Sequence, residues 1–189
     1  MTEKDIVGLF EKNNALLVGH FKLSSGLHSE KYLQCALVLQ HPGIAEEMAK
    51  ALAAKFSGTK IDLVVGPALG GVTFAYEVAR ALGVRGIFTE RDDGKMVLRR
   101  GFSIKASEKV LIVEDVVTTG LSTKEVMDVV KAHGGEVVGV CSIIDRSDVK
   151  PDYGVRFESL AKIKVDTYKP ETCPMCKKGS AAIKPGSRK

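Results

Sequence analysis

Three short apolar runs, separated by segments of helical character, constrain this fold more than any other feature of the sequence. The runs lie at residues 61–66, 109–115 and 136–145, and each has the length and composition of a strand that is buried on both faces. A further strand is predicted at residues 85–90. Because strands that alternate with helices form βαβ units, the sequence predicts an α/β fold with a central, mostly parallel sheet flanked by helices.

Apolar residues at helical spacing predict four helices, at residues 3–17, 42–58, 71–83 and 122–134. The third helix is expected to bury one face, which is made of Val72, Ala75, Tyr76, Ala79 and Leu82. The fourth is expected to begin with a capping box, in which Ser122 and Glu125 satisfy two backbone N–H groups. Residues 95–99 are expected to pair locally as a ribbon.

Four polar segments follow the predicted strands directly. They are GPALGG at residues 66–71, TERDDGK at 89–95, EDVVTTG at 114–120 and IDRS at 144–147. In open α/β sheets, ligands bind in the crevice at the carboxyl ends of the strands. These four segments are therefore expected to line one cleft.

The size and charge of the chain indicate one cytoplasmic domain. Of the 189 residues 44% are hydrophobic, which is enough for a sizeable core. No apolar run approaches the roughly 20 residues that span a bilayer, and the charged first residues do not resemble a signal peptide, so no membrane partner is expected. The formal charge of +5 originates in residues 162–189, which carry eight lysines or arginines and two acids. Such a tail is typical of a solvated terminus, and no nucleic-acid partner is expected.

Four cysteines are too few and too scattered for a disulfide framework. Cys35 and Cys141 lie in apolar segments and are interpreted as core residues. Cys173 and Cys176 have the spacing of half a zinc site, but no second CxxC exists. Histidines could complete a site only through folding, and the candidates are His20, His28, His41 and His133. A tight turn over residues 173–179 is the favoured interpretation, so no metal bound directly by the protein is expected.

The segment EDVVTTGLS places two carboxylates beside a set of hydrogen-bond donors. Glu114 and Asp115 end an apolar strand, and adjacent carboxylates resist ionisation unless a cation or donors compensate their charge. Backbone N–H groups and hydroxyls between Thr118 and Ser122 precede a helix, where they favour a phosphate. Sugar hydroxyls suit the carboxylates, and Mg²⁺ would neutralise the charge. The segment is therefore interpreted as a binding site for a sugar phosphate rather than as a solvated connection.

An apolar strand followed by EDVVTTG resembles the signature loop of the type I phosphoribosyltransferases, enzymes that bind phosphoribosyl pyrophosphate (PRPP). Within that group the chain resembles the orotate phosphoribosyltransferases over most of its length. Residues 19–34 are similar to that family's N-terminal hood, residues 66–71 to its pyrophosphate turn, and residues 144–147 to its orotate-contacting segment.

This resemblance implies a type I phosphoribosyltransferase fold, with a single domain over residues 1–189. The core is expected at residues 41–149, and a small hood is expected from residues 1–40 and 150–189. The resemblance also implies that the 5-phosphoribosyl group of PRPP is transferred to orotate, giving orotidine 5′-monophosphate and pyrophosphate, with Mg²⁺ bound through PRPP. It further implies a homodimer in which a mobile basic loop of one subunit completes the neighbour's active site.

The resemblance assigns roles to individual residues. Those assigned to PRPP are Glu114, Asp115, Val116, Val117, Thr118, Thr119, Gly120, Leu121 and Ser122, with Arg91 and Lys95 from the basic loop. Thr118 and Arg146 are assigned to orotate, whose carboxylate a guanidinium can meet bidentately. Asp115 and Lys95 are the expected catalytic residues. Tyr32 and Leu33 fall where the family contacts the base, although core packing explains them almost as well.

Two lysines of the family pattern are absent. Ser24-Ser25-Gly26 stands in the hood and Gly70-Gly71 in the pyrophosphate turn. Backbone N–H groups of the glycine turn, together with Mg²⁺, are expected to bind pyrophosphate instead. The basic loop at residues 89–102 is also short, so that Arg99 and Arg100 are alternatives to Arg91 and Lys95, and a plain solvated hairpin is a further interpretation. Two functional alternatives are a phosphoribosyltransferase for uracil, xanthine or adenine, and a non-catalytic PRPP sensor of the same fold.

Overall fold

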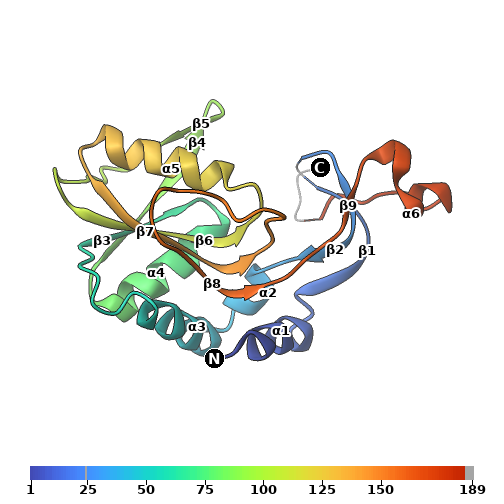
Figure 1. Ribbon diagram of the computed structural model, residues 1–189, viewed down its shortest axis with the longest axis horizontal. Coiled ribbons are helices and arrows are strands. Elements are labelled where there is room, and N and C mark those ends of the chain that lie inside the picture. The colour runs from blue at the N-terminus through green and yellow to red at the C-terminus, as the bar shows by residue number, and fades with distance from the viewer. Residues whose placement is uncertain (24, 186–189) are drawn as a thin grey trace.

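A six-stranded sheet forms the centre of the computed structural model, which describes residues 1–23 and 25–185 (Figure 1). Its strands are β3 (Leu63–Pro67), β4 (Arg85–Asp92), β5 (Lys95–Val97), β6 (Lys109–Val117), β7 (Glu136–Asp145) and β8 (Phe157–Lys162). They lie in the order β5-β4-β3-β6-β7-β8, and all neighbours run parallel except β5, which is antiparallel to β4. The predicted mostly parallel sheet and the local ribbon are confirmed, whereas β8 was not predicted.

Helices cover both faces of this sheet (Figure 1). One face carries α5 (Leu121–Ala132), and the other carries α1 (Glu3–Lys12), α2 (Ala36–Leu39), α3 (Pro42–Ala54) and α4 (Gly70–Leu82). Successive residues of a strand point to opposite faces, so Val64 packs in the cluster of α3 and α4 while Leu63 and Val65 pack in that of α5. Each face thus has its own hydrophobic core, as the wholly apolar strands require.

The order of the strands reverses between β3 and β6. From β3 the chain passes through α4 to β4 on one side, whereas β6 pairs with the opposite side of β3. Such a reversal opens a crevice at the carboxyl ends of the two strands. The segments GPALGG and EDVVTTG follow these two strands and therefore flank the crevice.

A second, smaller sheet lies beside the first (Figure 1). It is antiparallel, in the order β1-β2-β9, and is built from β1 (Leu16–Lys22), β2 (His28–Leu33) and β9 (Thr167–Tyr168). The 3₁₀ helix η1 (Pro170–Thr172) and the short helix α6 (Pro174–Lys177) follow β9, and Ile183 returns to bridge Phe21 of β1. We call residues 16–33 and 165–183 the hood. Segments from the two ends of the chain thus form one sheet.

The first predicted helix is too long by about one turn. α1 ends at Lys12, because Asn14 adopts a positive φ of 52° and the side-chain amide of Asn13 donates a hydrogen bond of 2.8 Å to the carbonyl oxygen of Leu9. Asparagine tolerates the left-handed region and competes for backbone partners, which ends a helix. Leu17, predicted on the helix, lies in β1 instead.

The predicted inner face of α4 is confirmed for Ala75 and Ala79 but wrong for Tyr76, and the predicted cap of α5 is wrong. α4 buries Phe74 and Val78, which are a stronger apolar pair at i and i+4, whereas Tyr76 is 64% exposed. α5 begins after Gly120 and has no side-chain cap. The carboxylate of Glu125 forms an ion pair with Arg91 of β4 and is not available for a capping box. In the described parts of the chain, no helix is both long and apolar enough to cross a membrane.

Candidate active site

Two adjacent carboxylates lie at the carboxyl end of β6 without a cationic partner. Glu114 is 7% exposed, and no lysine or arginine of the described residues forms an ion pair with it or with Asp115. Burial, reinforced by the charge of Asp115, raises the pKa of Glu114 to about 9. Burial also raises the pKa of Asp115, although the N–H of Val116 donates to its Oδ1 at 2.8 Å and opposes the rise. Within residues 1–23 and 25–185, this carboxylate pair therefore has no compensating cation.

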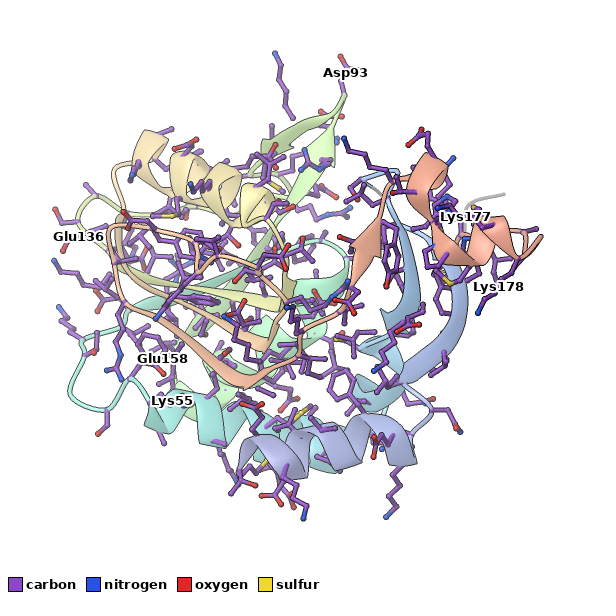
Figure 2. The ribbon with its side chains drawn as sticks, turned by 45° about the vertical axis from the view of Figure 1, so that its right-hand side comes forward. Lys55, Asp93, Glu136, Glu158, Lys177 and Lys178 are labelled. Atoms are coloured by element: carbon purple, nitrogen blue, oxygen red, sulfur yellow. The ribbon has the colours of Figure 1, made fainter. Side chains whose placement is uncertain are left out.

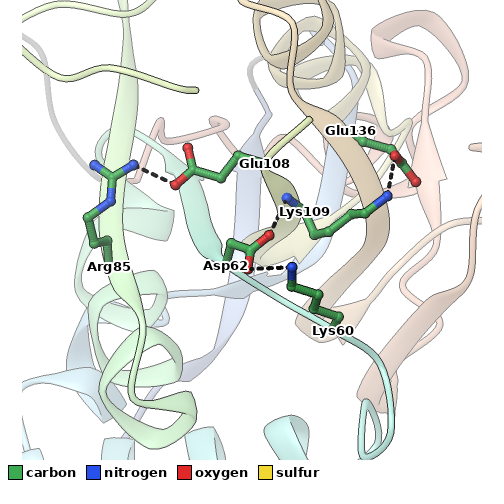
Figure 3. A network of polar contacts seen from close by, with 6 residues as sticks. All are labelled: Lys60, Asp62, Arg85, Glu108, Lys109 and Glu136. Atoms are coloured by element: carbon green, nitrogen blue, oxygen red, sulfur yellow. Dashed lines mark hydrogen bonds and ion pairs between the residues drawn. The ribbon is translucent and has the colours of Figure 1, made fainter. Parts of the chain in front are cut away.

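The opposite end of the sheet shows how this fold pairs its structural acids (Figure 3). There Arg85 donates to Glu108 at 2.8 Å, and Lys109 forms an ion pair with Glu136. Asp62 accepts the backbone N–H of Lys109 at 2.9 Å. At the amino ends of the strands the acids thus have basic or N–H partners. The contrast suggests that the pair at the carboxyl end serves a ligand.

The glycine turn after β3 comes into direct contact with this carboxylate pair. A Cβ atom placed on Gly70 would lie 2.4 Å from Oδ2 of Asp115, far inside the van der Waals distance. The turn begins at Gly66, continues through the cis peptide bond Ala68–Leu69, and runs into the first residues of α4. Only glycine at position 70 leaves room for the Asp115 carboxylate to contact the N-terminus of α4.

Gly70→Ala is expected to lower kcat/KM for the ribosyl donor about tenfold or more, because the added methyl group must displace the Asp115 carboxylate. A tenfold loss corresponds to an activation free energy that is higher by about 1.4 kcal/mol. Steady-state kinetics with the donor varied would measure this. Gly8→Ala is the matched control, since Gly8 lies inside α1 with no atom within 4 Å of an added Cβ. Equal kinetics in the two variants would contradict the proposed contact.

The segment after β6 forms a small cup of about 40 Å³ at the start of α5. Its walls are residues 118–122, which were predicted to bind a phosphate, together with Glu114, Val116, Val117 and Thr123. Thr118 and Thr119 are exposed, and Gly120 adopts a φ of 75°. Because the cup surrounds the N-terminus of α5, its N–H groups and the helix dipole favour an anion.

A cleft of about 380 Å³ separates the hood from the loops of the main sheet. Its walls come from both sides, with Leu23, Ser25, Leu27, Tyr32, Leu33 and Thr167 from the hood and Asp115, Thr118 and Arg146 from the sheet. The structure therefore brings Asp115, Thr118 and Arg146 together, as the sequence predicted. Tyr32 and Leu33 also reach the cleft. Ser24, which replaces a lysine of the family pattern, lies outside the described residues.

Arg146 extends into this cleft from the segment after β7. Its backbone N–H donates to the carbonyl oxygen of Val117 at 2.8 Å, which ties the segment to the end of β6. Among the described residues, its buried Nε atom has no hydrogen-bond partner. Burial lowers the pKa of the guanidinium, while Tyr32 and Asp148 favour the charged form. A buried, charged donor without a partner is a suitable partner for the carboxylate or carbonyl group of a ligand.

Arg91 and Lys95 do not reach this cleft in the single chain. Both lie on the β4–β5 hairpin, whose tip carries Asp93 and projects away from the rest of the molecule (Figure 2). Arg91 forms its ion pair with Glu125 and donates to the carbonyl oxygen of Gly94 at 2.7 Å. Lys95 is exposed, with no ion pair to any described residue. The alternatives Arg99 and Arg100 form ion pairs with Glu90 on the same hairpin.

Two residues around the site, Tyr153 and Thr167, were not predicted from the sequence. Tyr153 is 7% exposed, and its Oη would lie 2.6 Å from a Cβ on Gly120, so that it supports the phosphate cup from behind. Thr167 lines the cleft from β9, more than 130 residues after Tyr32 in the sequence. No local pattern marks either residue, because both contacts depend on how distant segments pack.

Comparison with known proteins agrees with this architecture. A family described as "Phosphoribosyl transferase domain" matches residues 36–155. The orotate phosphoribosyltransferase of Pelotomaculum thermopropionicum is 56% identical over 189 residues, which is 100% of both chains. That of Carboxydothermus hydrogenoformans is 57% identical over 187 residues, or 98% of each chain. The crystal structure of the orotate phosphoribosyltransferase from Aeropyrum pernix matches with a TM-score of 0.68 at 24% identity, over 84% of this chain and 93% of that one, which shows the shared fold.

Proposed function

The chain belongs to the orotate phosphoribosyltransferases, and from this membership we propose how its cleft carries out the family's reaction. The enzyme transfers the 5-phosphoribosyl group of PRPP to orotate, giving orotidine 5′-monophosphate and pyrophosphate in pyrimidine biosynthesis. One observation carries the assignment of the site: a carboxylate pair without a cationic partner among the described residues precedes the cup at the start of α5, and Asp115 of this pair shares a cleft with Arg146.

PRPP binds across the end of β6 in this proposal. The N–H groups and hydroxyls of residues 118–122 hold the 5′-phosphate at the start of α5. Glu114 and Asp115 form hydrogen bonds with the ribose hydroxyls, which adds partners to a pair whose one side-chain bond among the described residues comes from the N–H of Val116. The glycine turn at residues 66–71 borders Asp115 and presents backbone N–H groups to the pyrophosphate.

Orotate binds in the same cleft, between the hood and Arg146. The unpaired Nε of Arg146 supports a contact with a carboxylate or carbonyl of the base, and Thr118 lies on the adjacent wall. Tyr32 and Leu33 form the wall on the hood side. This arrangement favours an acidic pyrimidine over uncharged bases, because the half-buried guanidinium, whose Nε has no partner among the described residues, gains a counter-charge only from the acidic one.

Mg²⁺ fits the donor set of this site. Asp115 provides a carboxylate beside the glycine turn, and a nearby cation would favour release of the proton that burial keeps on Glu114. Hard oxygen ligands of this kind are those that Mg²⁺ prefers. We propose that the ion is held mainly by PRPP, as the resemblance implies, with this carboxylate pair next to the ribose hydroxyls. When bound, Mg²⁺ supplies positive charge for the departing pyrophosphate.

The protein's own residues act on the transfer by positioning and electrostatics. Displacement at the anomeric carbon develops positive charge on the ribose, and the Asp115 carboxylate lies where it stabilises that charge. Arg146 and Thr118 hold the base in line with the bond that breaks. Lys95, which is absent from the cleft of its own chain, is assigned to the pyrophosphate of a neighbouring subunit.

We propose a homodimer for this reason, with each hairpin completing the site of its neighbour. An apolar groove of about 400 Å³ beside the hairpin's base, lined by Val72, Tyr76, Phe88 and Phe102, supports an interface there. We also propose that the enzyme is cytoplasmic, since four scattered cysteines do not make the disulfide framework that is typical of small secreted proteins.

The test of this assignment is the loss of the ultraviolet absorbance of orotate in the presence of PRPP and Mg²⁺. Turnover with orotate at least about 100-fold faster than with uracil, xanthine or adenine is expected, since a buried unpaired charge costs several kcal/mol. Equal turnover with an uncharged base would exclude the proposed role of Arg146 in selecting the substrate.

Arg146→Gln is expected to raise KM for orotate about 10- to 100-fold, because it removes a charge-assisted hydrogen bond (about 1.5–3 kcal/mol). KM for PRPP should stay within about twofold, since the phosphate cup is untouched. Arg156→Gln is the matched control, as this arginine pairs with Glu158 on the surface. An unchanged KM for orotate in the Arg146 variant would assign the base to other residues.

A further inference from the structure

Four metal-ligating side chains from distant segments meet on the outer side of the hood. His20 lies in β1, His28 begins β2, Cys173 directly precedes α6, and Cys176 lies within it. One ligand atom of each lies within 4.8 Å of the others. Cys173 is fully buried, and His20 and His28 are 5% and 7% exposed. The expected plain turn at residues 173–179 is a short helix instead, and it directs both thiols onto the histidines of the sheet.

The distances between these atoms are those of one coordination sphere. A tetrahedral zinc ion with Zn–N of about 2.0–2.1 Å and Zn–S of about 2.3 Å places nitrogen and sulfur about 3.6 Å apart. Nε2 of His20 lies 3.5 Å from Sγ of Cys173 and 3.7 Å from Sγ of Cys176. Nδ1 of His28 lies 3.3 Å from Sγ of Cys176. The two nitrogens, 2.9 Å apart, would separate slightly on binding.

A hydrogen bond outside the cluster fixes the orientation of one histidine. Nδ1 of His20 lies 3.0 Å from the carbonyl oxygen of Ser180. A carbonyl oxygen can only accept, so Nδ1 carries the proton and Nε2 directs its lone pair at the two sulfur atoms. Second-sphere bonds of this kind hold zinc-binding histidines in place.

The charge and type of the ligands select zinc among the common cations. Two thiolates and two neutral imidazoles balance the charge of a divalent ion, so that the filled site is neutral and suits burial. Mg²⁺ and Ca²⁺ require oxygen ligands, which the cluster lacks.

The hood has few apolar contacts that would hold its two chain segments together. No described residue within 17–32 or 166–183 belongs to either hydrophobic core cluster. β9 adds only two residues to the sheet, and the chain end is joined to β1 by the bonds of Ile183 with His20 and Lys22, at 2.9 and 2.8 Å. A small sheet without a core of its own is commonly stabilised by a metal or a disulfide.

We propose that His20, His28, Cys173 and Cys176 bind one structural Zn²⁺, which fastens the C-terminal segment 167–183 to the hood. The ion is distinct from the Mg²⁺ of the active site and has no open position for substrate. Because residues of both fastened segments, Tyr32 and Thr167, line the cleft, zinc sets the shape of the wall against which the base lies.

Elemental analysis of the full-length protein, purified with a thiol reductant, tests the site directly. We expect about one zinc per chain after dialysis against a weak chelator. Cys176→Ser and His28→Asn should each lower this content at least about tenfold. His41→Asn is the matched control, since His41 is exposed at the start of α3 and outside the cluster. Wild-type protein that remains free of zinc after reconstitution with ZnCl₂ overturns the proposal.

A second measurement uses wild-type protein and does not depend on the folding of variants. Zinc is removed with a strong chelator under reducing conditions, and Co²⁺ is added. A tetrahedral site with two thiolates gives visible ligand-field bands and a thiolate charge-transfer band that saturate at one ion per chain. Removal of zinc should also lower the unfolding temperature by about 10 °C, with recovery on addition of Zn²⁺ but not of Mg²⁺. Cobalt spectra without thiolate bands, or a Cys173–Cys176 disulfide in the reduced preparation, overturn the assignment.

Discussion

Asp115→Asn is expected to lower kcat at least about 100-fold without lowering the temperature of unfolding. Asparagine keeps the shape of the side chain and can accept the 2.8 Å hydrogen bond from the N–H of Val116. It removes only the negative charge, which we assign to stabilising the positive charge on the ribose. Loss of one preorganised electrostatic contact in a transition state costs about 2.7–4 kcal/mol.

Stability should remain equal or rise in this variant, because Asp115 is half-buried and loss of solvent contact raises its pKa. A calorimetric scan and an assay at saturating PRPP, orotate and Mg²⁺ separate the two effects. A variant with normal turnover would remove Asp115 from the catalytic machinery, and a variant that unfolds would assign it a structural role.

Glu114→Gln is the companion variant, and it tests the charge state of the pair. The pKa of Glu114 rises from 4.5 to about 9 on folding, so the folded chain holds a proton that the unfolded chain has released. Its contribution to the free energy of unfolding is complete below pH 4.5 and is lost as the pH rises towards about 9. For one proton, the slope approaches about 1.4 kcal/mol per pH unit.

Glutamine cannot titrate, so the free energy of unfolding of this variant should fall less steeply between pH 5 and 9 than that of the wild type. The difference between the two slopes should be at most about 1.4 kcal/mol per pH unit. Chemical denaturation of the ligand-free protein at several pH values measures the difference. Identical slopes would mean that Glu114 is already ionised in the free protein.

The fold and the sheet side of the site were accessible from sequence because they rest on local patterns. The apolar runs at residues 109–115 and 136–145 correspond to β6 and β7, and the rule for parallel sheets then places Asp115, Thr118 and Arg146 at one edge. The glycine turn was identified in the same way. The contact between Gly70 and Asp115 was not predicted, because neither loop's sequence shows how far the two loops lie from each other.

Two of the failures share a physical cause, which is that tertiary contacts override local preference. Ser122 and Glu125 have the spacing of a capping box, yet Glu125 pairs with Arg91 of a strand that begins 36 residues earlier than the helix. Similarly, Cys173 and Cys176 appear as half a site in the sequence. His20 and His28 join them only because β9 and Ile183 return the chain end to the first hairpin.

Lys95→Ala is expected to lower kcat about 30- to 100-fold, since it removes a charge that we assign to the departing pyrophosphate (about 2–3 kcal/mol). The more informative experiment pairs this subunit with an Asp115→Asn subunit. In a heterodimer purified through two different tags, one site would combine an intact Asp115 with an intact Lys95 only if the hairpin acts across the interface.

Such a heterodimer should therefore regain about half of the wild-type turnover, whereas both homodimers stay nearly inactive. A heterodimer of Lys60→Ala and Asp115→Asn subunits sets the upper limit, because Lys60 lies at the amino end of the sheet and pairs with Asp62 (Figure 3). If the Lys95 heterodimer remains as inactive as its parents while this control reaches half, Lys95 acts within its own chain. The hairpin would then have to fold from its present position towards the cleft, breaking the ion pair between Arg91 and Glu125.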